Sequence, residues 1–275
     1  MGNETVRVAD RVRSRVRRLA VRMLTGPYTD ALRWRARRAD LTDGVTVIAV
    51  NFNTLPYMKA LVAGVRRHSS TELPIHIIDN ASTDASKSWA SEHPRVRFSW
   101  LPVNVHHGPA MDIGILRCRT THFIAIDVDA FPVDDTWLDR LLEPLRSGAK
   151  VVGAGYPPIP DPAVQPYVHA CCLAMSTRRF VDQHHTFSPG ESWDTAQSIS
   201  MREWPNIHPL PITSSRGPGI LGSVFGGVVY HNFYSARFAT TTRDRIDWVD
   251  RGQPEDAWAA AMRTYFPDRP DLHAG

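Results

Sequence analysis

Two aspartates separated by one residue directly follow an apolar run, and they are the most informative pair in the chain for chemistry. The apolar run is residues 123–126 (FIAI), and the pair is Asp127 and Asp129. Two carboxylates at positions i and i+2, just past the end of a strand, can both approach one cation. Hard oxygen ligands suit Mg²⁺ or Mn²⁺, and such sites commonly share the metal with substrate phosphates. The pattern therefore predicts a divalent-metal site beside a phosphorylated ligand.

Other polar side chains also follow short apolar runs. The run 45–50 (VTVIAV) ends at Asn51 and Asn53, and the run 74–79 (PIHIID) ends at Asp79 and Asn80. Ligands of open parallel sheets bind at the carboxyl ends of the strands. We expect these side chains to lie at the same edge of a sheet as the aspartate pair.

The elements that must position these groups are strands alternating with helices. Strand-like runs at 45–50, 74–79, 96–101 and 123–127 alternate with helical patterns at 55–68, 83–92 and 109–118. This alternation indicates an open α/β sheet that is mostly parallel. Downstream we expect a helix at 134–147, strands at 150–155, 169–175 and 228–234, and a closing helix at 254–266.

With these segments in order, the chain resembles the GT-A glycosyltransferases, and their inverting family 2 in particular. Residues 77–84 (IIDNASTD) resemble the family's V-D-N-x-S-x-D signature. Residues 104–115 (NVHHGPAMDIGI) resemble its N-x-G-x-x-x-A-x-N-x-G-I segment, with Asp112 where Asn is commoner and an altered spacing before Gly108. Residues 47–54 look like the first strand, and residues 123–129 like the strand that delivers the D-x-D. The resemblance implies a GT-A fold, a Rossmann-like nucleotide-binding sheet flanked by helices.

The resemblance assigns the donor-binding side chains. Asp79 would accept a hydrogen bond from the base, most often uracil, and Asn51 and Asn53 would line the base and ribose. Asp127 would contact ribose or metal, and His107 would face the sugar-phosphate. These roles imply a UDP-sugar or another nucleoside-diphosphate sugar as the donor.

The resemblance also assigns the metal and the general base. Asp129 would ligate a Mn²⁺ or Mg²⁺ ion that bridges the diphosphate, together with Asp127, and His231 would complete its shell. An inverting transferase needs a carboxylate to deprotonate the acceptor hydroxyl. Asp194 is our first candidate for this base and Glu191 our second, because both lie where a helix is expected to begin after the acceptor strand.

Charge divides the chain into two parts. The net charge is +4, but residues 1–44 hold 11 Arg, no Lys and five acids, and the remainder is slightly acidic. The main body is therefore not a basic nucleic-acid binder. Residues 5–24 read as a basic amphipathic helix that Gly26 and Pro27 should stop, followed by an Arg-rich segment at 28–39. Two interpretations stay open, a helix packed on its own domain or a peripheral contact with anionic lipid at the inner membrane surface.

The predicted organisation is an Arg-rich helical extension (1–44), a nucleotide-sugar half (45–130), an acceptor half (131–240) and a C-terminal helical segment (241–275). Three cysteines without metal spacing, and no apolar leader or spanning segment, favour a cytoplasmic protein. The expected activity is a metal-dependent, inverting transfer of the hexosyltransferase type, to a glycan, a lipid-linked sugar or a small natural product. The alternatives are a sugar-nucleotide nucleotidyltransferase, which the absence of Gly, Lys and Arg in residues 51–56 disfavours, and a non-catalytic, membrane-tethered nucleotide-sugar binder.

Overall fold

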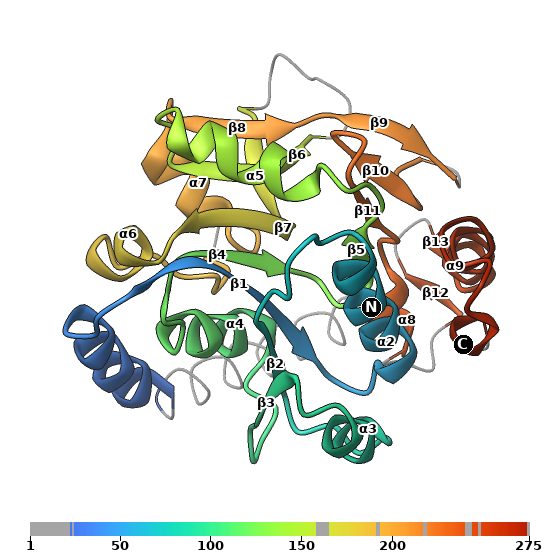
Figure 1. Ribbon diagram of the computed structural model, residues 1–275, viewed down its shortest axis with the longest axis horizontal. Coiled ribbons are helices and arrows are strands. Elements are labelled where there is room, and N and C mark those ends of the chain that lie inside the picture. The colour runs from blue at the N-terminus through green and yellow to red at the C-terminus, as the bar shows by residue number, and fades with distance from the viewer. Residues whose placement is uncertain are drawn as a thin grey trace, which may run out of the picture.

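A seven-stranded sheet with the order β3-β2-β1-β4-β7-β6-β8 forms the centre of the molecule (Figure 1). The computed structural model describes residues 23, 25–157, 165–190, 193–216, 219–239, 244–246 and 249–273. The strands of this sheet are β1 (Thr42–Asn51), β2 (Ile75–Asp79), β3 (Val96–Trp100), β4 (Thr120–Ile126), β6 (Val151–Tyr156), β7 (Tyr167–Ser176) and β8 (Ile207–Leu210). Parallel pairing joins β3, β2, β1 and β4, whereas β7 runs antiparallel to both of its neighbours. The sheet is mostly parallel, as the sequence predicts.

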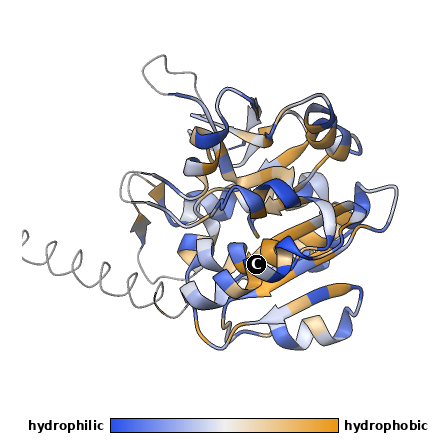
Figure 2. Ribbon diagram, turned by 90° about the vertical axis from the view of Figure 1, so that its left-hand side faces the viewer, coloured by the Kyte–Doolittle hydropathy of each residue, from blue (hydrophilic) through white to orange (hydrophobic). Residues whose placement is uncertain are grey.

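Strand β1 shows why the sheet strands are continuous apolar runs. Its Val47 and Ala49 belong to one hydrophobic layer, and its Ile48 and Val50 belong to the layer on the other face. Successive side chains of a strand point to opposite faces, so a strand covered on both sides is apolar throughout. Figure 2 shows the apolar residues gathered in the strands and the hydrophilic residues on the outward sides of the helices.

Helices cover the two faces of the sheet. On one face lie α2 (Leu55–Arg67) and α5 (Trp137–Arg146), and on the other lie α4 (His107–Leu116), α6 (Thr177–Asp182) and α7 (Gln197–Glu203). α3 (Ser86–Glu92) begins three residues later than expected, because Asp84 rather than Ser82 or Thr83 meets its first N–H groups. Oδ1 of Asp84 accepts from the N–H of Ser86 at 3.0 Å, and Oδ2 accepts from the N–H of Leu55 at 3.2 Å. One carboxylate therefore helps to start both α2 and α3.

A helix that includes residues 25–37 packs on the same face as α4 and α6. Its Leu32 and Ala36 are buried in that hydrophobic layer. The expected helix stop at Gly26 and Pro27 is wrong, because both residues lie within this helix. The hydroxyl of Thr29 bonds to the carbonyls of Thr25 and Gly26 at 3.0 and 2.9 Å, which supports the turn around the proline. The helix expected at 5–24 lies outside the described residues except for Met23.

A second, four-stranded sheet stands beside the first, with the order β5-β11-β10-β9. Its strands are β5 (Ala130–Pro132), β11 (Val229–His231), β10 (Ser223–Phe225) and β9 (Ile212–Ser215). The remaining elements are α8 (Ser235–Ala239), the hairpin of β12 (Arg245–Ile246) and β13 (Val249–Asp250), α9 (Gly252–Tyr265) and a 3₁₀ turn (Pro270–Leu272). α9 closes this sheet with Trp258 and Met262, which share a hydrophobic cluster with Phe131 and Tyr230. The second sheet begins only four residues after β4 ends, so it places new side chains next to the D-x-D pair.

Candidate active site

Asp127, Asp129 and His231 come together where the two sheets meet. The two aspartates occupy the turn between β4 and β5, and His231 is the register partner of Ala130 in the β11–β5 ladder. Nε2 of His231 therefore lies 3.3 Å from Oδ1 of Asp129 and 3.7 Å from Oδ2 of Asp127. One ligand atom from each of the three residues can be chosen so that all lie within 4.8 Å of one another.

The surroundings of this cluster fit a bound cation. Asp129 and His231 are buried, and Oδ1 of Asp127 and Nδ1 of His231 are buried without a hydrogen-bond partner. Burial opposes ionisation of Asp129, but His231 and the N–H of Ala236 hold the pKa of its carboxyl below the ordinary value. Two carboxylates and one imidazole are a donor set that suits a divalent metal.

The N-terminus of α4 points its first residue toward the same cluster. Nε2 of His107 lies 3.3 Å from Oδ1 of Asp127. His106, which precedes the helix, has a φ of 69°, a conformation uncommon for any residue but glycine. The start of an α-helix carries partial positive charge and free N–H groups. His107 and the helix start are therefore placed to meet negative charge beside Asp127.

A cavity of about 610 Å³ opens over the cluster. The carboxylates and His231 form part of its wall, between one side from β1, β2 and the start of α4 and another side from β6, β7 and the segment before α7. The lining side chains include Phe52, Thr54, Asn80, Asn104, His106, His107, Tyr156, His169, Asp194, Phe233 and Arg237. A hollow of about 680 Å³ between α2, α3 and the C-terminal residues lies away from this chemistry, and its Arg67 is paired with Asp268.

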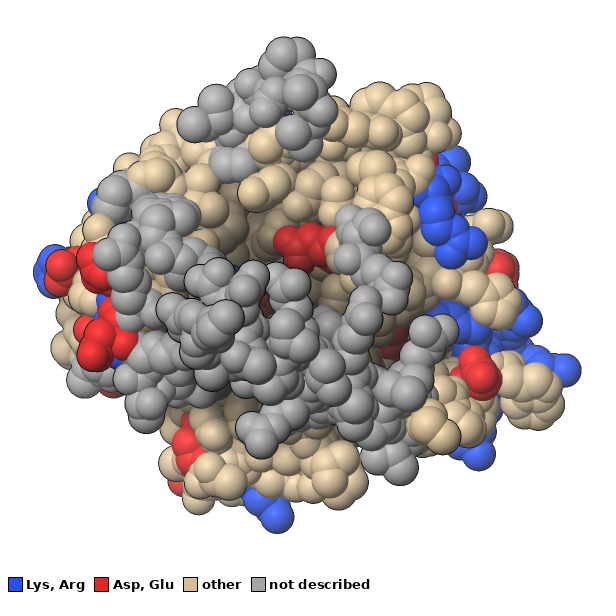
Figure 3. All heavy atoms as spheres, turned by 180° about the vertical axis from the view of Figure 1, so that it is seen from behind, with Lys and Arg blue, Asp and Glu red and all other residues tan. Residues whose placement is uncertain are grey.

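Acidic side chains occupy a hollow on one face of the molecule, and both acidic and basic side chains lie toward its edges. Figure 3 shows Asp and Glu side chains in a hollow near the middle of that face, and Lys and Arg side chains mostly toward its right-hand edge. The helix of residues 25–37 lies on that side in this orientation. This distribution agrees with a slightly acidic main body and a basic N-terminal part.

The structure corrects the expected contacts of Asn51 and Asp79 with the nucleotide. Both side chains are fully buried behind the cavity wall. Asp79 accepts from Nδ2 of Asn51 at 2.7 Å and from the N–H of Ser82 at 2.8 Å, so both of its oxygens are engaged. The amide oxygen of Asn53 is also engaged, by the N–H groups of Thr83 and Asp84, at 2.7 and 3.3 Å. These residues shape the strand-end turns instead of facing the cavity.

Asn80 and Asn104 line the cavity on the side of β1, β2 and α4, and no role was predicted for either. Nδ2 of Asn80 donates to Oδ1 of Asn104 at 3.1 Å, and Oδ1 of Asn80 accepts from the N–H of Val105 at 2.9 Å. Two sequence features point to them. Asn80 follows Asp79 in a strand-end motif where side chains alternate in direction, and Asn104 opens the 104–115 segment.

Asp194, our first candidate for the base, lies in the cavity wall. Its Oδ1 accepts from the N–H of Thr195 at 2.7 Å, and its side chain is exposed. Glu191, the second candidate, lies outside the described residues. The neighbouring Trp193 is 45% exposed. Asp194 is thus the described carboxylate placed across the cavity from the donor wall.

A family model named glycosyl transferase family 2 matches residues 46–191. The chain belongs to glycosyl transferase family 2. It is therefore a glycosyltransferase, and the match extends from β1 through β7 and α6, including the turn that carries Asp127 and Asp129. Comparison with curated protein sequences finds no relative.

Solved structures share the GT-A fold of this glycosyltransferase. Residues 1–349 of TarS from S. aureus, in complex with UDP-GlcNAc, match with a TM-score of 0.51 at 12% identity, covering 85% of this chain and 71% of that 349-residue piece. The mannosyltransferase PcManGT from Pyrobaculum calidifontis, in complex with GDP-Man and Mn²⁺, matches with a TM-score of 0.50 at 16% identity, covering 94% and 79%. Among the residues that the structure describes, no helix is long and apolar enough to cross a membrane.

Proposed function

We propose that this glycosyltransferase moves a sugar from a nucleoside-diphosphate sugar to an acceptor hydroxyl with inversion at the anomeric carbon, and that it needs a divalent metal. The observation that carries the proposal is the cluster of Asp127, Asp129 and His231 in the wall of a cavity whose other wall holds Asp194. The mannosyltransferase of similar fold binds GDP-Man and Mn²⁺, which supports a donor and a metal of this kind.

Asp127, Asp129 and His231 would hold the metal. When bound, the ion would neutralise the charge that develops on the departing diphosphate. Carboxylates suit both Mg²⁺ and Mn²⁺, and the imidazole nitrogen favours the transition metal of the two. His107 and the start of α4 would contact the diphosphate, because they offer positive potential next to Asp127.

Asp194 would act as the general base. Its carboxylate would take the proton from the acceptor hydroxyl while that oxygen attacks the anomeric carbon from the side opposite the diphosphate. A single displacement of this kind inverts the configuration at that carbon. The acceptor would lie near Asp194 and the aromatic side chains Tyr156 and Phe233, which also line the cavity.

The metal site is tested by Asp127→Ala/Asp129→Ala, with Asp139→Ala, an exposed carboxylate on α5, as the control. The donor for this test is chosen first, by measuring the melting temperature of the wild-type protein with different nucleotide-sugars in the presence of Mn²⁺. The nucleotide-sugar that raises the melting temperature most is used. A ligand at 100 times its Kd adds about 2.7 kcal/mol of stability. The double variant should lose donor turnover and stay folded, and Asp139→Ala should match the wild type. Full turnover in the double variant, or in excess EDTA, would exclude the metal-dependent mechanism.

The base is tested by Asp194→Asn, which keeps the shape of the side chain and removes its basicity. The variant should bind UDP with Mn²⁺ like the wild type and transfer sugar about 10²–10⁴-fold more slowly. Glu191→Gln is the matched comparison, because Glu191 is the second candidate base. If Glu191→Gln loses transfer and Asp194→Asn retains it, the two assignments must be exchanged.

A further inference from the structure

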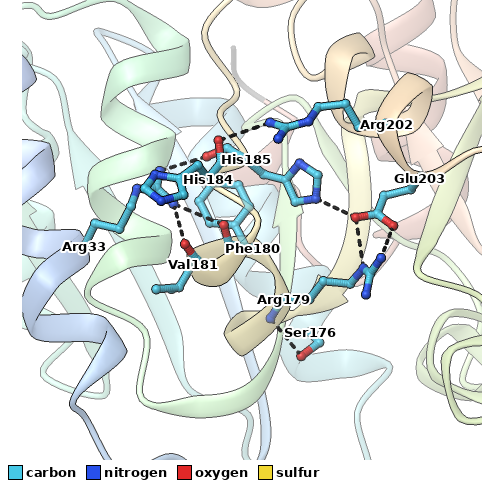
Figure 4. A network of polar contacts seen from close by, with 9 residues as sticks. All are labelled: Arg33, Ser176, Arg179, Phe180, Val181, His184, His185, Arg202 and Glu203. Atoms are coloured by element: carbon cyan, nitrogen blue, oxygen red, sulfur yellow. Dashed lines mark hydrogen bonds and ion pairs between the residues drawn. The ribbon is translucent and has the colours of Figure 1, made fainter.

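Arg33 joins the helix of residues 25–37 to the segment that leads to Asp194. Its guanidinium is buried, and it donates to the carbonyl oxygens of Phe180 and Val181 at 3.1 Å each and of His185 at 2.9 Å (Figure 4). Phe180 and Val181 are in the last turn of α6, where carbonyls lack partners within the helix. Arg33 therefore caps α6 and holds the first residues that follow it.

The contact is reciprocal. Arg178 of α6 donates to the carbonyls at the end of the 25–37 helix, those of Ala36, Arg37 and Ala39, at 3.3, 2.7 and 2.8 Å. Each helix thus caps the C-terminal end of the other with one arginine. This arrangement makes the helix a fixed neighbour of α6, although it lies outside the residues that the family model matches.

The side chain of His185 continues the connection to α7. Its Nε2 lies 2.6 Å from Oε1 of Glu203, and Glu203 also accepts two hydrogen bonds from Arg179, at 2.9 and 2.6 Å (Figure 4). His185 and Glu203 are both buried. Losing the hydrogen bond from His185 would leave a buried polar group of Glu203 with one partner fewer, which is costly inside a protein. This contact therefore holds His185 against α7.

The next residues are held by α4. Asp112 accepts a hydrogen bond from the hydroxyl of Thr186 and another from the N–H of Phe187, the latter at 2.7 Å. A side chain at Gly108 would come within 2.7 Å of the carbonyl oxygen of Phe187, so the segment lies directly on the first turn of α4. That turn begins with His107, which faces Asp127.

The other end of the segment is tied to the start of α7. The side chain of Gln197 accepts from the N–H of Asp194 at 2.9 Å, and the N–H of Gln197 donates to the carbonyl of Asp194 at 3.1 Å. Asp194 is therefore placed by α7, and α7 is placed by His185 and Glu203. Arg33 fixes the backbone at His185, where these connections meet.

We propose that Arg33 is a positioning residue for sugar transfer, which acts by anchoring the segment from His185 toward Asp194. This inference rests on the proposed role of Asp194. It makes the helix of residues 25–37 a working part of the acceptor side of the site. Arg33 itself does not line the cavity.

The test compares full-length Arg33→Met, Arg33→Lys and Arg35→Met, the last of which removes an exposed arginine from the same helix. Hydrogen exchange followed by mass spectrometry reports the backbone at 185–190 and needs no ligand. Hydrolysis of the selected nucleotide-sugar gives kcat, and calorimetry gives the Kd for UDP with Mn²⁺. Arg33→Met should speed this exchange and lower kcat, each about tenfold or more, and leave the Kd within about twofold of wild type.

Arg33→Lys should restore part of the lost kcat, because lysine still donates to carbonyls, and Arg35→Met should match the wild type. A folded Arg33→Met protein with wild-type exchange and kcat would overturn the inference. If Arg33→Met does not fold, the same measurements on Arg33→Lys and Glu203→Gln replace it. Hydrogen exchange at 185–190 equal to that of the wild type in both variants would overturn the inference. A wild-type protein that binds no UDP and hydrolyses no nucleotide-sugar would instead overturn the proposed function, and the catalytic role of Arg33 with it.

Discussion

Asp112 carries a buried carboxyl in a place where its charge is only partly compensated. Burial raises its pKa to about 6, against the opposing effects of the hydrogen bonds from Thr186 and Phe187 and of nearby Arg33. A pKa that is higher in the folded state than in the unfolded state adds stability at low pH, and this contribution disappears as the pH rises through 6. Asp112 should therefore weaken the fold between about pH 4 and pH 7.

Asp112→Asn should remove that pH dependence. The amide keeps the shape of the side chain and stays neutral, so the stability of the variant relative to wild type should rise by on the order of 2–3 kcal/mol from pH 4 to pH 7.5. Urea unfolding at the two pH values measures the difference, with the exposed Asp139→Asn as control. An equal difference between variant and wild type at both pH values would show that this carboxyl does not titrate as proposed.

At the residue level, sequence motifs identified types of residue better than directions of side chains. The D-x-D pair was proposed because two carboxylates follow an apolar run, and Asp194 because an acid stands where a helix was expected to begin, and both roles remain predictions. The metal-shell role of His231 remains a prediction, although the structure brings the ring next to both aspartates. Asp79 and Asn80 could not be separated by motif alone, because which of them faces the cavity depends on how the turn beyond β2 folds.

At the scale of elements, α4 packs tightly on the sheet at Gly114. A Cβ atom there would lie 2.7 Å from Cγ2 of Ile48 and 2.9 Å from Cγ1 of Ile78, which are side chains of β1 and β2. Gly114→Ala should therefore push α4 off the sheet and cost about 1–3 kcal/mol of stability. Gly252→Ala is the control, because nothing lies within 4 Å of its Cβ position. Equal denaturation midpoints for the two variants would contradict this packing.

The long elements could be predicted, and the short ones could not. The strands β1, β2, β3 and β4 are each five residues or longer, and each contains at least three apolar residues within one short run. β5, β10 and β11 are three residues long, too short to show any period. The second sheet was missed for this reason, although the run at 228–234 indicated the strand that carries His231.

At the scale of the whole molecule, two truncations test whether the helix of residues 25–37 stabilises the fold. Deleting residues 1–40 should lower the melting temperature, because it removes Leu32 and Ala36 from the hydrophobic layer and Arg33 from three carbonyls. Deleting residues 1–22 keeps these contacts, so this truncation should melt at a higher temperature than the one that lacks residues 1–40. Equal melting temperatures for both truncations would contradict the packing of the 25–37 helix.

The same truncations address the two interpretations of residues 5–24. Binding to anionic vesicles at low salt that disappears at high salt and on deletion of residues 1–22 would support a lipid contact. Vesicle binding that is the same with and without residues 1–22 would favour the other interpretation, in which residues 5–24 pack on the protein. The domain boundaries predicted at 44, 130 and 240 remain predictions.

Two of the candidate metal ligands, Asp127 and Asp129, lie in the turn between β4 and β5, and the third, His231, lies about a hundred positions later, at the end of β11. A bound ion would therefore act as a cross-link, because it would close the long loop of chain between Asp129 and His231. Cross-links that close long loops restrict the unfolded chain more than short ones do. On this basis the nucleotide-binding half and the second sheet would unfold together when metal is present, and more independently after the metal is removed.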